Sequence, residues 1–400
     1  MLQLQIVNFK QGTYLVVEGK PDSDHFYIIQ KGFVQCMKAS GSGIAPVKYG
    51  PGDFVGVVPC MSGHLQIETA IAVTDVFAIS VRREQYPDLI VNNTPVALKI
   101  IRTFASRMRQ MNEMLTKATL NNVVNATSEQ IFKVAKYYES VLRPDAAVFA
   151  YYQYLKTKPI GSNAEYAKEK FIKLKTRTNA VYYEPTNELT RIYPEGTMIF
   201  SEAQSGSDMF IIQRGEVAIS KVVDGNEVTL AVLQRGDMFG EMALLENKPR
   251  SANAIAHKEC KLMVVNHANF NQMVSTQPQL ISSLTITLAE RLWSMYRQLD
   301  NANLHDPFHK MLDMLSLQIE KKKVDIDKMT SKVEQTDLTP KDLANMCGIP
   351  NELQPRAIYD FSTCSHIKLV DGKIYIKDVP ELVKQTAFYR KQNQEAQEKN

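Results

Sequence analysis

Residues 236–256, GDMFGEMALLENKPRSANAIA, combine a glycine turn, the start of a short helix and a basic residue within one loop. Gly240 lets the backbone turn sharply and approach a ligand closely. Met242 and Ala243 begin a short helix whose free amide groups face an anion. Arg250 is placed to contact a phosphate through charge-assisted hydrogen bonds, each worth about 1.5–3 kcal/mol. The loop therefore has the features of an anion-binding site.

The sequence around this loop belongs to a unit that occurs twice. The run FYIIQKG at 26–32 recurs as MFIIQRG at 209–215, and Gly12 is separated from its counterpart Gly196 by 184 positions. The same shift relates other glycine and arginine positions of the two copies, so one register covers the whole unit, with a one-residue adjustment in a loop.

Within each copy, short β-branched runs such as FIIQ and EVAIS are separated by turn residues at hairpin spacing. This pattern predicts a small antiparallel β-barrel. A longer helical pattern follows each barrel, at 92–116 and at 277–299. In the second helix an apolar stripe is expected to pack on the barrel or on a partner helix. It consists of Leu284, Leu288, Leu292, Met295 and Leu299.

The loop at 236–256 resembles the phosphate-binding cassette of cyclic-nucleotide-binding domains, as in the bacterial catabolite activator and the kinase regulatory subunits. In that family a Gly-Glu pair at a helix start and an Arg a few residues later surround the ribose-phosphate ring. The resemblance covers nearly all of residues 190–299. It implies cyclic AMP or cyclic GMP as the ligand, with no metal. The implied ligand-binding residues are Gly240, Glu241, Met242, Ala243, Arg250 and Ser251.

Within this cassette the resemblance gives Glu241 and Ser251 distinct roles. Glu241 is expected to accept the ribose 2′-hydroxyl and to help neutralise a buried Arg250, while Ser251 adds a hydroxyl. The alternative is a structural ion pair between Glu241 and Arg250 that never meets a ligand. The combined order Gly-Glu, helix start and Pro-Arg-Ser-Ala favours the ligand site, because it is more specific than any one residue.

The first copy lacks the charged residues of the cassette. At the shift of 184, Val57 stands at the position of Glu241 and Gln66 at that of Arg250, while Glu68 replaces Ala252. A carboxylate near a phosphate would repel it. We therefore predict that the first copy does not bind a cyclic nucleotide in the same way and has a structural role.

Trp293 and Tyr296 are the candidates for contact with the base. The catabolite activator uses polar residues on its trailing helix for adenine, and the comparable stretch here is Trp293, Ser294, Met295 and Tyr296. Either aromatic ring could stack on a purine, or it could simply belong to a core or an interface. The choice between adenine and guanine stays open.

Between the two copies, residues 124–180 have a helical pattern with several aromatic residues. Stacked hairpins of tetratricopeptide type are one interpretation, and an ordinary helical connector is the preferred one, because a single partial motif is weak evidence.

The C-terminal region from Leu338 resembles the winged helix-turn-helix of the same activator family. Thr339 is a predicted N-cap, with Pro340 at the first helical position and Asp342 in the capping-box position. Asp371-Gly372 is predicted to close a hairpin that would form the wing.

The second helix of this unit departs from the family pattern. Pro355 would break a helix that begins at Asn351, and a helix capped by Gln354 would lose a turn of its reading surface. Either start compromises recognition of DNA. The candidate DNA contacts are Asn351, Gln354 and Arg356.

Bulk properties place limits on the function. A chain of 400 residues with 44% hydrophobic residues is expected to form two to three domains, and a net charge of +4 does not indicate a nucleic-acid or membrane partner. The five cysteines are far apart and are interpreted as reduced thiols. No signal peptide or membrane-spanning stretch is apparent, which predicts a cytoplasmic protein. We find no nucleophile and base arrangement or metal set, so an enzyme is not expected.

Together these features predict an α+β multidomain protein with two jelly-roll-like barrels, each with a trailing helix. The expected domains are a degenerate barrel at 1–120, a helical connector at 121–183, a cyclic-nucleotide-binding domain at 184–303, and a helical linker with a winged helix-turn-helix at 304–400.

We interpret the chain as a cyclic-nucleotide-responsive transcription regulator. A version that binds DNA should form a homodimer, because each chain has one winged unit. The alternative is a sensor that acts through protein contacts and does not bind DNA.

Overall fold

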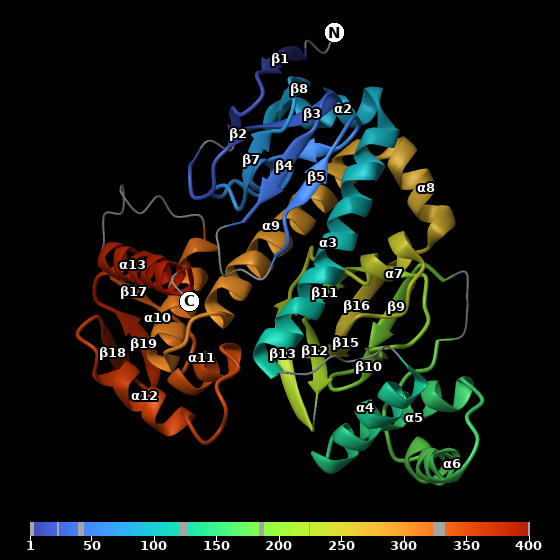
Figure 1. The fold of residues 1–400 in the computed structure, drawn as a ribbon. Helices are drawn as coiled ribbons and strands as arrows, with labels where there is room; N and C mark the ends of the chain where they lie inside the picture. The colour runs from blue at the N-terminus through green and yellow to red at the C-terminus, as the bar shows by residue number, and fades with distance from the viewer. Residues whose placement is uncertain are drawn as a thin grey trace. The chain divides into compact units, whose positions relative to one another are not determined.

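A computed structural model describes residues 4–21, 24–38, 44–120, 127–183, 188–223, 225–322 and 333–398 (Figure 1). The chain forms two compact units, and each contains one β-barrel. The first unit comprises Met1–Phe104, Lys117–Thr119 and Pro278–Asn400, and the second comprises Ala105–Thr116 and Leu120–Gln277.

The first barrel consists of two four-stranded antiparallel sheets, in the orders β1-β8-β3-β6 and β2-β7-β4-β5. Aliphatic residues of both sheets fill its core. Its strands are β1 (Gln5–Phe9), β2 (Tyr14–Val16), β3 (His25–Lys31), β4 (Val34–Met37), β5 (Val47–Tyr49), β6 (Phe54–Val55), β7 (Thr69–Ala72) and β8 (Val76–Arg82).

The second barrel repeats this topology, with sheets in the orders β9-β16-β11-β14 and β10-β15-β12-β13. The predicted two-copy, jelly-roll-like architecture is therefore confirmed. The strands are β9 (Thr190–Tyr193), β10 (Met198–Phe200), β11 (Met209–Arg214), β12 (Val217–Val223), β13 (Asn226–Leu233), β14 (Met238–Phe239), β15 (Asn253–Ala256) and β16 (Cys260–Val265).

One tight turn explains the glycine that ends the repeated run in both copies. Gly32 and Gly215 have φ values of +91° and +90°. A Cβ atom at either position would lie 2.2 Å from a backbone oxygen, that of Asp75 or Glu259. Only glycine fits this close approach of two backbone segments.

Helices follow both barrels, near the positions that the sequence predicts. Around the first barrel they are α1 (Val57–Ser62), η1 (Arg83–Gln85), α2 (Tyr86–Asn92) and α3 (Thr94–Leu120). In the sequence of the second copy they are α7 (Glu241–Glu246), α8 (His267–Thr276) and α9 (Pro278–Ala302). The helices expected at 92–116 and 277–299 are therefore confirmed as α3 and α9.

Each long helix ends in the unit that contains the other barrel. Residues Ala105–Thr116 of α3 belong to the unit of the second barrel, and α9 belongs to the unit of the first barrel. The predicted apolar stripe of α9 is buried, and the helix packs on α1 and α2.

Polar and aromatic contacts join α9 to the first barrel at three positions along the helix. The hydroxyl oxygens of Thr285 and Tyr86 are 2.9 Å apart. The Trp293 ring stacks on His64 with a centroid distance of 3.7 Å. Near the end of the helix, Asp300 forms an ion pair with the buried Lys38, at 3.0 Å. These contacts span most of the length of α9.

The connector consists of α4 (Ser128–Ser140), α5 (Pro144–Lys156) and α6 (Ser162–Lys175), with α5 packed between the other two. Its aromatic core continues into the second barrel at Met198 and Val222. Gln130 of α4 donates a hydrogen bond to the Val222 carbonyl oxygen at 2.9 Å. The connector is therefore part of the second unit. Its expected start at 121 lies outside the described residues, and its expected end at 183 is a described residue that follows α6.

The C-terminal region forms helices around a three-stranded sheet of order β17-β19-β18. Its elements are α10 (Pro307–Glu320), β17 (Glu334–Gln335), α11 (Pro340–Met346), α12 (Gln354–Thr363), β18 (Ile367–Val370), β19 (Lys373–Ile376) and α13 (Val379–Glu398).

The local predictions for this region are largely confirmed. Thr339 and Asp342 form the expected capping box, and the hairpin turn at Asp371-Gly372 has two positive φ values. The second helix begins at Gln354 with Leu353 as its N-cap, one residue before the cap predicted at Gln354, and Pro355 lies in its first turn. The sequence analysis did not anticipate α13.

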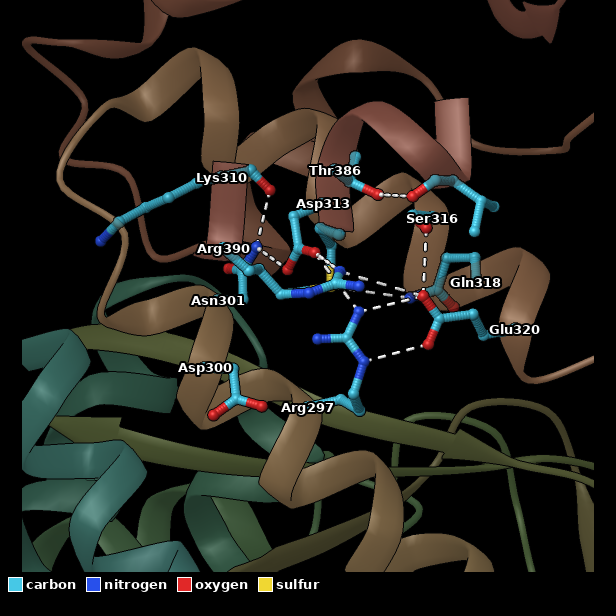
Figure 2. Close-up of polar contacts among 12 residues, drawn as sticks. Arg297, Asp300, Asn301, Lys310, Asp313, Ser316, Gln318, Glu320, Thr386 and Arg390 are labelled. Carbon is cyan, nitrogen blue, oxygen red and sulfur yellow. Dashed lines mark hydrogen bonds and ion pairs between the residues drawn. The ribbon is translucent and has the colours of Figure 1, made fainter. Parts of the chain in front are cut away.

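A buried cluster of charges joins α9, α10 and α13 (Figure 2). Asp313 of α10 is fully buried and forms ion pairs with Arg297 of α9, at 3.3 Å, and with Arg390 of α13. Arg297 also binds Glu320 at 3.0 Å, and Asn301 donates to Asp313 at 3.1 Å. Burial raises the pKa of Asp313, but the two arginines outweigh it and hold that pKa below its ordinary value. The carboxylate is therefore charged at neutral pH and binds the three helices together.

We predict that Arg390→Ala destabilises the first unit by about 3 kcal/mol, because it removes one partner of a buried charge. The adjacent Lys391 forms an exposed ion pair with Glu395, so Lys391→Ala should cost less than about 0.5 kcal/mol. Urea denaturation followed by the fluorescence of Trp293, the only tryptophan, measures both. Equal losses in the two variants would contradict the assignment of this cluster as a structural clamp.

Candidate functional site

The loop between β14 and β15 in the second barrel brings a glycine, a carboxylate and a guanidinium together. Gly240 caps α7 with a φ of +79°, and Glu241 is the buried first residue of that helix. A Cβ atom at Gly240 would lie 2.7 Å from Nη1 of Arg250 and 3.1 Å from the backbone oxygen of Asp208. The turn therefore requires glycine for two reasons, its backbone conformation and the approach of Arg250.

Arg250 is the central residue of this site. Its side chain is buried, with 5% of the residue exposed, and Nη1 donates a hydrogen bond to the Gly240 carbonyl oxygen at 2.9 Å. The guanidinium lies 4.2 Å from the centre of the Phe200 ring. Its Nε atom is buried and has no hydrogen-bond partner, and among the described residues the guanidinium forms no ion pair. The cation is therefore only partly satisfied by the protein.

The pKa of Arg250 is consistent with this shortage of hydrogen-bond and ion-pair partners. Burial lowers the pKa of Arg250 to about 10, although Asp208 and Glu241 act in the opposite direction. The group still carries its charge at neutral pH. An anion at the unpartnered side of the guanidinium would stabilise that charge, which makes the loop suited to a phosphate.

The remaining predicted cassette residues lie on the same loop. Met242 and Ala243 are buried in α7, and the half-buried Ser251 places its Oγ 3.4 Å from the Met242 sulfur. The structure thus brings Gly240, Glu241 and Arg250 into one cluster, with Ser251 beside it.

Sequence reasoning missed Phe200, Asp208 and Gly206, which also surround Arg250. A Cβ atom at Gly206 would lie 2.9 Å from Nε of Arg250. Comparison of the two copies contains a signal for one of these residues, since Phe200 corresponds to Val16 of the first copy. An aromatic ring replaces an aliphatic side chain only in the copy that has the arginine.

Arg109 of α3 is a further residue that the sequence did not single out. Its Nη1 donates to the carbonyl oxygen of Pro249 at 3.2 Å, directly before Arg250. Met108 and Met111 on the same half of α3 are buried. The helix that follows the first barrel thus touches the cassette of the second.

The first barrel has the same turn without the charges. Gly56 caps α1 with a φ of +75°, as Gly240 caps α7, but Val57 follows it and the buried Gln66 replaces the arginine. Burial raises the pKa of Glu68 to about 7, against the opposing effect of Lys38. This loop therefore offers no guanidinium to a phosphate. Its failure to bind a cyclic nucleotide stays a prediction.

The two predicted base contacts lie in the first unit. Trp293 is buried and stacks on His64. Tyr296, the residue directly before Arg297, is also buried. These contacts correspond to the packing role that the sequence left open for aromatic residues of this helix. Contact with a base stays a prediction for both.

The three predicted DNA contacts differ in their surroundings. Asn351 is exposed, and 91% of the Arg356 side chain is exposed, with Asp360 at 3.8 Å. Gln354 is buried, and its amide donates to Asn345 at 3.0 Å and to the Ile349 carbonyl oxygen at 2.9 Å. As folded, Gln354 joins α12 to the preceding segment.

No described helix has the length and apolar character that would let it cross a bilayer. Among the same residues, no group of three or more His, Cys, Asp and Glu side chains is arranged to hold a metal ion.

Comparison with known proteins gives two matches to one family. The cyclic nucleotide-binding domain family matches residues 6–93 and 190–277, which together are less than half of the chain. Two segments of the chain, one in each barrel, are therefore similar to this domain family. The match at both sites agrees with the common topology of the barrels.

Similar proteins are regulators of the cyclic AMP receptor type. A cyclic AMP receptor protein of Thermus thermophilus is 32% identical over 28% of this chain and 51% of its own length, so the chain spans about half of that relative. A CRP-like cAMP-activated global transcriptional regulator of Mycobacterium tuberculosis is 25% identical over 48% of this chain and 85% of its own length. A solved structure of the catabolite activator protein of Thermus thermophilus is 24% identical to this chain, with a TM-score of 0.28. The match covers 50% of this chain and 89% of the solved chain.

We predict that Gly240→Ala loosens the second barrel more than Gly236→Ala does. Both glycines have positive φ, +79° and +94°, so both alanines cost about 1–2 kcal/mol of backbone strain. Only the alanine at 240 also meets Arg250 and Asp208, since nothing lies within 4 Å of the other. Hydrogen exchange of barrel peptides measures the local opening free energy. Equal effects would show that the approach of Arg250 does not matter for stability.

Proposed function

We propose that this chain is a cyclic-nucleotide-responsive regulator, without catalytic activity, that binds its ligand in the second barrel. The observation that carries this proposal is the buried guanidinium of Arg250, which has no ion-pair partner among the described residues and lies beside Glu241. The family match to residues 190–277 supports it independently.

In this proposal the cyclic phosphate occupies the unsatisfied side of Arg250. The phosphate supplies the negative charge that the cluster lacks, and Ser251 adds a hydroxyl donor. Glu241 accepts the ribose 2′-hydroxyl, as carboxylates do when ionised. Cyclic AMP and cyclic GMP share this ribose-phosphate chemistry, so the cassette does not select between them.

The purine has two sets of candidate neighbours. Trp293 and Tyr296 retain their proposed role as base contacts. Arg109 of α3 already contacts Pro249 in the cassette, and an arginine can donate two hydrogen bonds to the N7 and O6 of guanine. Titration with cyclic AMP and with cyclic GMP shows whether the site prefers adenine or guanine.

We propose DNA as the target of the C-terminal region, which would act as a winged helix-turn-helix in a homodimer. In its support, α11 and α12 are followed by the hairpin of β18 and β19, and Asn351 and Arg356 are exposed near the start of α12. The similarity to a transcriptional regulator over 85% of that protein's length also favours DNA. Two chains would then read the two halves of a symmetric site.

A protein partner is the second candidate, and the surface of α12 favours it. Leu353 and Tyr359 are 51% and 68% exposed, while Arg356 lies beside the carboxylate of Asp360. A groove-reading helix normally presents unneutralised cations to the phosphates. Exposed apolar side chains are more typical of a protein interface.

We predict that Arg250→Ala weakens binding of cyclic AMP or cyclic GMP about 100-fold, because two or more charge-assisted hydrogen bonds are lost. Calorimetric titration measures the affinity, with cyclic dinucleotides as further ligands. The matched control is Gln66→Ala in the first barrel, which should leave the affinity within twofold. Undiminished binding by Arg250→Ala, or no binding of any of these ligands by the intact protein, would refute the proposed site.

We predict salt-sensitive association with DNA that depends on the ligand. In fluorescence anisotropy with mixed genomic fragments, the logarithm of affinity should fall with the logarithm of salt concentration, and Arg356→Ala should reduce the slope by about one. Arg214→Ala, an exposed arginine in the second barrel, is the control. Absence of association at every salt concentration would remove DNA as the target and leave the protein partner.

A further inference from the structure

We infer that Arg191 is a positioning residue of the second-barrel site, which holds the Asp208 carboxylate in an ion pair and so keeps Arg250 available to an anionic ligand. This inference rests on the proposed function. It concerns a residue of β9, far in sequence from the cassette, that the family resemblance does not single out.

Arg191 is a second buried guanidinium next to the first. Only 8% of the residue is exposed, and its Nη2 lies 3.4 Å from Oδ2 of Asp208. The group lies 5.3 Å from the centre of the Tyr183 ring and 5.9 Å from that of Phe210. The aromatic rings and the carboxylate together hold the guanidinium in place.

Asp208 lies between the two arginines. Its backbone oxygen approaches Gly240 on the same side as Nη1 of Arg250, and the Arg250 guanidinium is also 5.9 Å from the Phe210 ring centre. Of the charged groups that act on Arg250, Asp208 is the strongest, ahead of Glu241. Nevertheless, this carboxylate pairs with Arg191, and Arg250 has no ion pair among the described residues.

The arrangement sets up a competition for Arg250. A free Asp208 carboxylate close to a buried cation would pair with it, because a buried charge gains most from a partner of opposite sign. Such a pair would occupy the guanidinium that the phosphate needs. By neutralising Asp208, Arg191 removes the internal competitor, and the ligand becomes the strongest available anion for Arg250.

The experiment is a double-mutant cycle on the full chain, with Kd for cyclic AMP and cyclic GMP measured by calorimetry. We expect Arg191→Ala to raise Kd about tenfold, since the released carboxylate then competes with the phosphate. Asp208→Asn removes the competitor and should leave Kd within twofold. The double variant Arg191→Ala/Asp208→Asn should recover binding to within about threefold of the original protein.

A matched control and a second substitution keep the result interpretable. Arg214→Ala removes an arginine of the same barrel whose ion pair with Glu259 is exposed, and it should leave Kd unchanged. Arg191→Gln preserves most of the side-chain volume. If Arg191→Ala does not fold, as judged by hydrogen exchange of the barrel, Arg191→Gln should show the same loss and the same rescue by Asp208→Asn.

Two outcomes would overturn the inference. If the double variant binds as weakly as Arg191→Ala, the residue only supports the fold, and the competition does not exist. If Arg191→Ala and Arg191→Gln bind normally while Arg250→Ala does not, Arg191 has no role although the proposed site stands. A protein that binds no cyclic nucleotide even before substitution would instead remove the proposed function itself.

Discussion

A cation that is buried without a paired carboxylate imposes the main constraint on the second barrel. Arg250 is stabilised by the Phe200 ring, by a hydrogen bond to one carbonyl oxygen and by the electrostatic attraction of Asp208 and Glu241. A buried ion pair is costly to break, and an unpaired buried charge is more costly still. The protein tolerates this cost where an anion from outside could relieve it. Glycine at positions 206 and 240 leaves space for the guanidinium, which a Cβ atom at either position would approach too closely.

Helix α9 connects the parts of the chain on which regulation would depend. It follows the second barrel directly in sequence, yet its side chains bind His64 and Lys38 of the first barrel and Asp313 of α10. The contacts along its length are of different kinds, a ring stack, a largely buried ion pair and a fully buried charge cluster. A displacement of this helix would therefore disturb the first barrel and the C-terminal region together, since neither can retain its contacts while α9 moves alone.

Much of this architecture could be predicted from local sequence signals. The repeated glycine turns, the capping box at Thr339 and the Asp371-Gly372 hairpin act within a few residues, so the sequence displays them directly. The cassette geometry around Gly240 and Arg250 was accessible for the same reason. The partners of α3 and α9 were not, because an apolar stripe states that a helix is buried but not against which surface. Arg191 and Asp208 were missed because an ion pair between a strand and a distant loop leaves no mark on sequence spacing.

Helix residues that follow one barrel in sequence belong to the compact unit of the other barrel, so a barrel and its following helix are not an independent domain. Domain borders drawn from the repeat alone, at 1–120 and 184–303, would leave each barrel attached to a helix whose buried face belongs to the other unit. Met108 and Leu115 of α3 and Leu288 and Trp293 of α9 would become exposed in such fragments. Each copy of the repeat therefore supplies helix residues that are buried in the unit of the other copy.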